Sequence, residues 1–212
     1  MTQAPLMDRI HITEDYDVPR VINGGWQLSA GHALERPLDL ADASRAFNRL
    51  IDMGFDTFDC ADIYTGVEDF FGGIIRERRK AGLRLPQIHT KFVPDLNDLA
   101  NVTPAYIENI ITRSLRRLGV ERLDAVQFHW WDYSVPGMVD VADELVRLQE
   151  KGLIRLISTT NFNAVELRKL IDAGIPVATN QCQYSVLDRR PAMRLERLCR
   201  ETGVKLSLIH IS

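Results

Sequence analysis

Short apolar runs alternate with longer amphipathic stretches along most of the chain. The short runs have the length and composition of buried strands, at residues 21–26, 57–60, 88–93, 123–130, 153–158 and 177–181. The stretches between them carry apolar residues at helical spacing, at residues 41–53, 68–80, 104–118, 139–151, 163–173 and 191–202. A strand followed by a helix, six times over, predicts parallel strands joined by crossover helices.

Residues with special backbone preferences mark the ends of these helices. Thr103 and Pro104 form a helix start, because threonine caps the first turn and proline suits its first position. Asn163, with Glu166 three residues later, resembles a capping box. Glycine follows most of the predicted helices, as at Gly119, where a left-handed residue ends the helix.

This alternation fits either an open doubly wound sheet or a closed barrel. An open sheet that binds a dinucleotide would carry G-x-G-x-x-G after its first strand, whereas residues 24–27 read Gly-Gly-Trp-Gln. The sequence therefore favours an α/β fold of the (β/α)8 TIM barrel type. Such a barrel has eight units and about 250 residues, so we expect only about six of the eight to be present. No linker interrupts residues 1–205, which we interpret as one incomplete barrel domain.

Residues 206–212 read Leu-Ser-Leu-Ile-His-Ile-Ser, which is also the translation of a common transposase sequencing adapter. We expect this segment to be a non-native tail and exclude it from the predicted fold. Without two further units, the first and sixth predicted strands would be unpaired edges. The loops that bind phosphate in such barrels would also be missing. We therefore expect the 212-residue fragment to be aggregation-prone and inactive.

Composition and charge narrow the possible partners. The chain has 26 Lys and Arg against 29 Asp and Glu, so its net charge is -3 and no basic face for nucleic acid is indicated. No apolar run approaches the roughly 20 residues that cross a membrane. The three cysteines are widely spaced and odd in number, which favours reduced thiols in the cytoplasm.

Four ionisable residues stand where predicted strands end: Asp59, Tyr64, Lys91 and His129. Catalytic groups of β/α barrels lie at the carboxyl ends of the strands. A buried Lys91 needs a carboxylate, and Asp59 is the candidate. A cation beside Tyr64 would lower its pKa, so that the phenol could act as a general acid. His129 could orient a substrate oxygen or share the proton. This set suits protonation of a carbonyl oxygen while a hydride reaches its carbon.

Three segments together resemble the aldo-keto reductase superfamily. Residues 54–68 are similar to the family segment G-F-x-x-x-D-x-A-x-x-Y-G-x-x-E, 88–91 to its lysine strand, and 123–130 to L-D-x-x-x-x-H-W. The resemblance extends over residues 18–205. It implies an oxidoreductase barrel that reduces a small aldehyde or ketone with NADPH (NADP). It also implies a catalytic tetrad with Tyr64 as the proton donor, made of Asp59, Tyr64, Lys91 and His129.

The same resemblance implies cofactor contacts. Residues 157–162 are similar to G-V-S-N-F and 180–184 to N-Q-x-x-Y, which assigns the nicotinamide carboxamide to Thr160, Asn161 and Gln181. Gly25 and Trp26 match the turn after the first strand, so Gly25 is expected near the cofactor. Trp26 and Trp130, with Trp131, are expected to line the substrate pocket. Two alternatives remain open: Asn161 could cap the next helix, and Trp26 could be a core residue.

Two other functions are compatible with a barrel. One is a non-catalytic regulatory subunit of the same fold that senses a nicotinamide nucleotide, although such a sensor has no need of Tyr64 and Lys91 together. The other is a metal-dependent barrel such as a sugar isomerase, although its carboxylate and histidine ligands do not cluster in this sequence. The fold alone does not identify the substrate.

Overall fold

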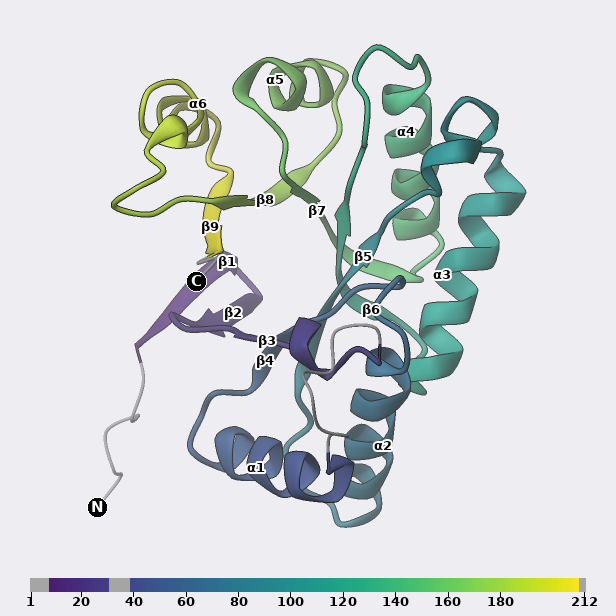
Figure 1. Cartoon of the computed structure of the whole chain (residues 1–212), viewed down its shortest axis with the longest axis vertical. Helices are drawn as coiled ribbons and strands as arrows, with labels where there is room; N and C mark the ends of the chain where they lie inside the picture. The colour runs from purple at the N-terminus through teal and green to yellow at the C-terminus, as the bar shows by residue number, and fades with distance from the viewer. Residues whose placement is uncertain (1–7, 31–38, 210–212) are drawn as a thin grey trace. The chain divides into compact units, whose positions relative to one another are not determined.

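The computed structural model describes residues 8–30 and 39–209. Parallel strands alternate with helices in these residues, as the sequence predicts (Figure 1). The strands of the larger sheet have the hydrogen-bonded order β3-β4-β5-β6-β7-β8-β9. In chain order they are β3 (Asn23–Gly24), β4 (Thr57–Asp59), β5 (Gln87–Phe92), β6 (Leu123–Phe128), β7 (Ile154–Thr160), β8 (Val177–Gln183) and β9 (Lys205–Ile209).

Six α-helices among the described residues confirm the six predicted helical stretches. They are α1 (Leu40–Asp52), α2 (Val67–Lys80), α3 (Pro104–Leu118), α4 (Met138–Glu150), α5 (Ala164–Asp172) and α6 (Leu195–Thr202). The last is shorter than predicted, because Pro191 lies in a separate 3-10 turn, η3 (Arg190–Ala192). Two further 3-10 turns are η1 (Trp26–Leu28) and η2 (Leu96–Asn101).

The predicted N-terminal caps at Thr103 and Asn163 are confirmed. Tyr106 N donates to Thr103 Oγ1 at 3.2 Å, which satisfies one free amide of the first turn of α3. Asn163 Oδ1 accepts from Val165 N at 2.9 Å and from Glu166 N at 3.0 Å. The Glu166 carboxylate itself pairs with Lys169 at 2.8 Å. Local polar groups thus set where α3 and α5 begin.

The chain divides into two compact units, and the division falls inside β5, α3 and β6. Unit 1 comprises Met1–Thr90 and Thr112–Asp124, and unit 2 comprises Lys91–Ile111 and Ala125–Ser212. Each unit has its own aromatic core. In unit 1, rings of α1, α2 and β4 pack with centroids 5.0–5.6 Å apart: Phe47, Phe58, Phe70 and Phe71. In unit 2, Phe128 packs against Trp130 and Phe162 at 5.8 and 5.6 Å.

Unit 1 begins with an antiparallel hairpin that the sequence pattern did not indicate. Strand β1 (Arg9–Thr13) pairs with β2 (Tyr16–Pro19). Arg9 ties this hairpin to the rest of the unit, because its guanidinium pairs with Asp17 and lies 2.9 Å from the buried carboxylate of Asp56. In the same unit, β4 pairs in parallel with β3 and β5, with Asp59 opposite both Gly24 and His89.

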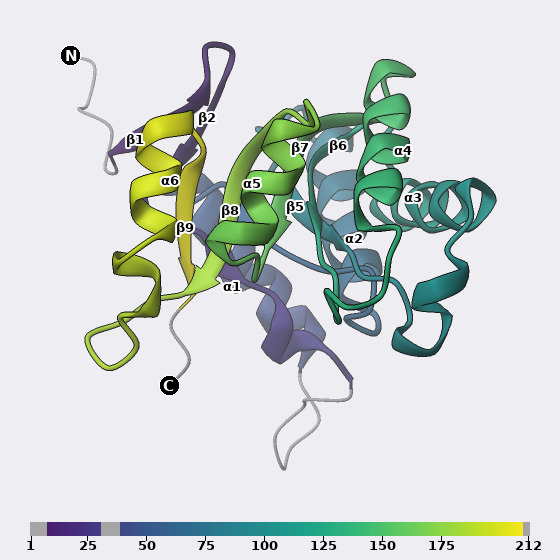
Figure 2. The same cartoon turned by 90° about the horizontal axis from the view of Figure 1, so that it is seen from above.

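The prediction that the sixth strand is an unpaired edge is wrong. Lys205–Ile209 form β9, which pairs in parallel with β8 over five consecutive residues. The backbone hydrogen bonds of a strand do not depend on its side chains, and Leu206, Leu208 and Ile209 suit a half-buried strand. The predicted edge at the sixth strand is therefore occupied. His210–Ser212 lie outside the described residues. In unit 2, α5 and α6 lie beside each other along β8 and β9 (Figure 2).

Candidate functional site

The predicted site residues divide between the two units. Unit 1 holds Gly25, Trp26, Asp59 and Tyr64. Unit 2 holds the remaining six, which are Lys91, His129, Trp130, Thr160, Asn161 and Gln181. The predicted pairing of Asp59 with Lys91, and of Lys91 with Tyr64, stays a prediction. Within each unit, however, the surroundings of the site residues are well defined.

In unit 1, the end of β4 and the following loop carry Asp59 and Tyr64. Asp59 O accepts from Gly25 N at 2.8 Å, and Cys60 N donates to His89 O at 2.7 Å. These two backbone hydrogen bonds continue the pairing of β4 with its neighbouring strands up to Asp59, where the chain leaves the sheet. Tyr64 follows in a tight turn, in which its amide donates to Ala61 O at 3.1 Å.

Gly25 packs closely against this strand end. A Cβ atom at this position would lie 3.0 Å from Asp59 O, 2.9 Å from a Val67 methyl and 3.0 Å from the Phe71 ring. Packing within unit 1 therefore accounts for the glycine by itself, and a contact between Gly25 and a cofactor stays a prediction. Trp26 is 46% exposed, which excludes the alternative that it is a core residue of unit 1.

In unit 2, His129 follows β6 directly and is fixed by its neighbours. Its backbone amide donates to Phe92 O at 3.0 Å, and its Nδ1 lies 3.2 Å from Thr160 O. A carbonyl oxygen can only accept, so the proton of neutral His129 sits on Nδ1 and Nε2 carries a lone pair. The indole of Trp131 packs edge-on against the imidazole at 4.5 Å.

The pKa of His129 lies below its ordinary value of 6.5. Burial is the main cause, because it disfavours the imidazolium, and the charge of Lys91 acts in the same direction. The hydrogen bond to Thr160 opposes the shift only in part. The charges of Lys91, which is itself buried, and of protonated His129 therefore repel each other within unit 2. At neutral pH, His129 is neutral and its Nε2 accepts hydrogen bonds.

Thr160 and Gln181 stand opposite each other on β7 and β8, and their buried side chains meet. Thr160 Oγ1 donates to Gln181 Oε1 at 3.4 Å, and Asn161 N donates to Gln181 O at 2.7 Å. Asn161 has φ +62°, the one positive value outside glycine among the described residues. Helix α5 is capped by Asn163, so the alternative that Asn161 is its cap is excluded. A strained residue beside paired polar side chains is a feature of binding sites.

The three tryptophans differ in their surroundings. Trp130 is 1% exposed, and its Nε1 donates to Val135 O at 3.3 Å. It packs inside unit 2 against the Phe128 ring, and its place in a substrate pocket stays a prediction. Trp131 is 48% exposed, and its Nε1 donates to Pro94 O at 2.8 Å. Trp131 therefore presents an aromatic surface beside His129.

Two other kinds of site receive no support from the described residues. No group of three or more His, Cys, Asp or Glu side chains is arranged to hold a metal ion in residues 8–30 and 39–209. Burial raises the pKa of the Cys182 and Cys199 thiols to about 11, which disfavours the nucleophilic thiolate. None of the helices described here is long and apolar enough to cross a membrane.

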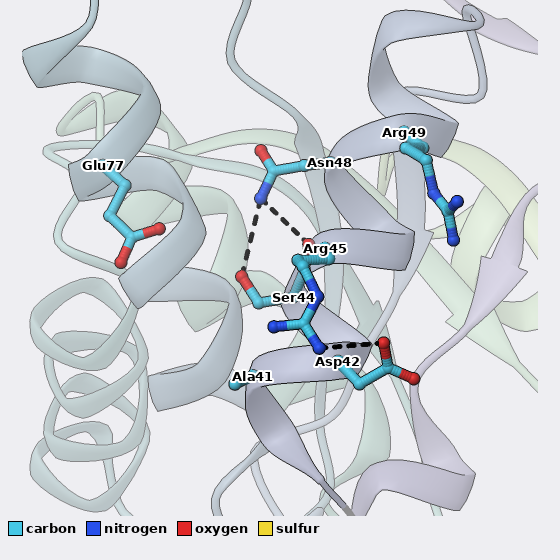
Figure 3. A pocket seen from close by; sticks show the side chains of 7 residues that line it. All are labelled: Ala41, Asp42, Ser44, Arg45, Asn48, Arg49 and Glu77. Carbon is cyan, nitrogen blue, oxygen red and sulfur yellow. Dashed lines mark hydrogen bonds and ion pairs between the residues drawn. The ribbon is translucent and has the colours of Figure 1, made fainter.

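A surface hollow lies between α1 and α2 of unit 1 (Figure 3). Its volume is about 650 Å³, and it is lined by helix residues that bond mainly within α1, such as Arg45 to Asp42 at 3.1 Å. Asn48 Nδ2 donates to Ser44 O at 2.9 Å in the same helix. These satisfied polar groups indicate an ordinary groove between two helices.

The lowered pKa of His129 predicts how stability depends on pH. Below about pH 6.5 the unfolded chain takes up a proton at this position, whereas the folded chain does so only at lower pH. The free energy of unfolding should therefore fall as the pH drops below 6.5.

NMR titration of the His129 ring should give a pKa below 6.5, and Lys91→Met should raise this pKa. Urea unfolding of His129→Gln should show a weaker loss of stability between pH 7.5 and 5.5. A wild-type imidazole that titrates at 6.5 or above would contradict this assignment.

Comparison with known proteins agrees with the α/β fold described above. The profile of the Aldo/keto reductase family matches residues 20–210. The chain is 29% identical over 199 residues to the chloroplastic pyridoxal reductase of Arabidopsis thaliana, covering 86% of this chain and 51% of that protein. It is 28% identical over 216 residues to the NADH-specific methylglyoxal reductase of Escherichia coli (strain K12), covering 91% and 63%. The chain thus spans between half and two thirds of these relatives.

Solved structures show the same fold. A thermostable aldo-keto reductase in complex with the inhibitor epalrestat matches with a TM-score of 0.78 at 23% identity, over 94% of this chain and 71% of that one. The aldo-keto reductase of Bombyx mori in complex with NADP matches with a TM-score of 0.77 at 21% identity, over 95% and 66%. These likenesses show an α/β fold of the (β/α)8 barrel type, of which this chain forms a part. Because the family profile covers nearly the whole chain, the protein belongs to the aldo/keto reductase family.

Proposed function

We propose that the protein containing this chain is an oxidoreductase that reduces a small aldehyde or ketone by hydride transfer from NADPH. The observation that carries the proposal is the match of residues 20–210 to the aldo/keto reductase family. Relatives named as methylglyoxal reductases, in Escherichia coli (strain K12) and Yersinia pestis, support a small carbonyl substrate. The three buried cysteines, which lie in the described residues, form no disulfide with one another, and this is compatible with the reducing cytoplasm that we propose.

In this proposal Tyr64 donates the proton to the carbonyl oxygen, and Lys91, paired with Asp59, lowers its pKa. The charge state of His129 supports the choice of Tyr64. A neutral imidazole with its proton bound to Thr160 has no proton to give at Nε2, so it accepts a hydrogen bond and orients its partner. We therefore propose His129 as an orienting residue.

Residues of unit 2 fit the nicotinamide carboxamide. That group offers one carbonyl acceptor and an amide with two donors, and the ends of β7 and β8 offer a hydroxyl and two side-chain amides. We propose that Thr160, Asn161 and Gln181 hold it. When bound, the cofactor supplies the hydride. We propose that Trp26, Trp130 and Trp131 line the substrate side. Trp26 and Trp131 are each about half exposed, whereas Trp130 is buried.

A spectrophotometric assay tests the proposed substrate and the proposed cofactor in one experiment. The protein that contains this chain is mixed with methylglyoxal or pyridoxal, and oxidation of NADPH and of NADH is followed at 340 nm. We expect carbonyl-dependent oxidation, with a higher kcat/KM for NADPH. Faster turnover with NADH would overturn the choice of NADPH and place this protein with its NADH-specific relative. Binding of NADPH without turnover of either carbonyl would favour the regulatory subunit that senses a nucleotide.

A further inference from the structure

The loop that carries Tyr64 is short and is bounded by two turns. It runs from Asp59, at the end of β4, to Val67, at the start of α2. Tyr64 N donates to Ala61 O at 3.1 Å, and Val67 N donates to Tyr64 O at 3.0 Å. The backbone position of Tyr64 is therefore set by the residues immediately on either side of it.

Helix α3 holds both sides of this loop through arginine. Arg117 Nη1 lies 3.2 Å from Asp62 O and 3.2 Å from Glu68 Oε2, so one guanidinium binds the chain two residues before and four residues after Tyr64. Arg113, one turn earlier on α3, lies 3.4 Å from the buried carboxylate of Asp62. A planar guanidinium fixes the direction of its partners better than an ammonium group does.

Glu68 extends this linkage to β5. Its side chain is 1% exposed, and its second oxygen accepts from Thr90 Oγ1 at 2.7 Å. Thr90 is fully buried and immediately precedes Lys91 in the strand. A buried carboxylate requires compensating partners, so Glu68 cannot leave Arg117 and Thr90 without a large cost. One side chain thus joins the Tyr64 loop, α3 and β5.

We propose that Arg117 and Glu68 are positioning residues for Tyr64, and the proposal rests on the function proposed above for that tyrosine. Neither residue is assigned any contact with substrate or cofactor. They hold residues 62–68 in one conformation, so that the phenol stays where it can protonate the carbonyl oxygen. Small displacements of a reacting group reduce the rate strongly, by about 100-fold for about 1 Å.

Steady-state kinetics of Arg117→Met and Glu68→Gln test this role in the protein that contains the chain. We expect kcat to fall by about 10- to 100-fold in Arg117→Met and by less in Glu68→Gln, with KM and the Kd for NADPH within about twofold of wild type. Because both variants break the same contact, the double variant should be no slower than Arg117→Met. Arg147→Met is the control for loss of a helix arginine, since the more exposed Arg147 makes ion pairs within α4, with Asp143 at 3.1 Å and Glu144 at 2.9 Å.

A spectroscopic measurement detects the displacement without any turnover. The chain has five tyrosines, and labelling with 3-fluorotyrosine gives each a ¹⁹F signal. Tyr64→Phe identifies the Tyr64 signal. We expect Arg117→Met and Glu68→Gln to shift or broaden this signal and to leave those of the other tyrosines unchanged. Glu68→Gln keeps the shape of the side chain and removes the buried charge, so it remains informative if Arg117→Met does not fold.

The outcomes separate this proposal from the assignment of Tyr64. If Tyr64→Phe loses turnover while folded Arg117→Met and Glu68→Gln keep wild-type kcat and an unchanged Tyr64 signal, the positioning role is wrong. The role is also wrong if all tyrosine signals shift and KM rises in parallel with the loss of kcat, because that pattern indicates a general structural defect. If Tyr64→Phe keeps its turnover, the assignment of Tyr64 itself fails, whereas a selective shift of its signal would still show that Arg117 and Glu68 hold the loop.

Discussion

Replacing Tyr64 with phenylalanine is expected to lower kcat for carbonyl reduction by about 10²- to 10⁴-fold, the contribution typical of a positioned general acid. The substitution removes a single oxygen atom and keeps the backbone hydrogen bonds of residue 64 with Ala61 and Val67. The fold and the Kd for NADPH should therefore stay unchanged. Rapid mixing with methylglyoxal gives the rate of hydride transfer, and quenching of protein fluorescence by NADPH gives the Kd.

Tyr106→Phe is the matched control for this experiment. It removes a phenol oxygen that accepts from Asp95 N at 3.0 Å in unit 2, outside the proposed site. We expect wild-type turnover for this variant. Turnover within twofold of wild type in Tyr64→Phe would contradict the role of Tyr64, and a parallel loss in Tyr106→Phe would point to a general sensitivity to tyrosine hydroxyls.

Gly72→Ala is expected to destabilise the protein by about 3 kcal/mol or more, because overpacking at a rigid contact forces the backbone to move. A Cβ atom at Gly72 would lie 2.0 Å from the carbonyl oxygen of Arg117, far inside contact distance. That oxygen belongs to the backbone of α3 and cannot turn away as a side chain can. Helix α2 would have to move away from α3. This movement would also disturb the contact of Arg117 with Glu68.

The neighbouring Gly73 provides the control. A Cβ atom at Gly73 would meet nothing within 4 Å, and its position in the same helix is partly exposed. Alanine suits a helix interior better than glycine, so Gly73→Ala should stabilise the protein by about 0.5–1 kcal/mol. Urea unfolding followed by circular dichroism measures both variants. Equal stabilities for the two variants would contradict the close packing of α2 on α3.

Much of the fold follows from local signals in the sequence. Helix starts at Thr103 and Asn163 are confirmed because side-chain caps act within a few residues. The hairpin of β1 and β2 was missed because its residues alternate only weakly, and its link to Asp56 through Arg9 spans 47 positions in the chain. Strand β9 was not predicted because residues 206–212 have the sequence of a non-native tail, whereas strand pairing depends on the backbone.

The candidate site was predictable to a smaller extent. Strand ends select Asp59, Lys91 and His129, because apolar runs mark where a strand leaves the core. The supporting residues were not found, since Arg117 and Thr90 reach Glu68 across 49 and 22 positions of the chain. No local sequence pattern indicates contacts over such distances along the chain. For the same reason the sequence could not tell that Trp130 packs into unit 2 while Trp131 remains exposed.

The most direct test of the proposed carbonyl reduction follows the hydride itself. The protein that contains this chain is incubated with methylglyoxal and NADPH that carries deuterium at both C4 positions of the nicotinamide ring, and the product is analysed by mass spectrometry and NMR. We predict an alcohol with one deuterium on the former carbonyl carbon, formed at a rate that Tyr64→Phe reduces strongly. An alcohol without deuterium at that carbon, or no alcohol while NADPH is bound, would contradict the proposal.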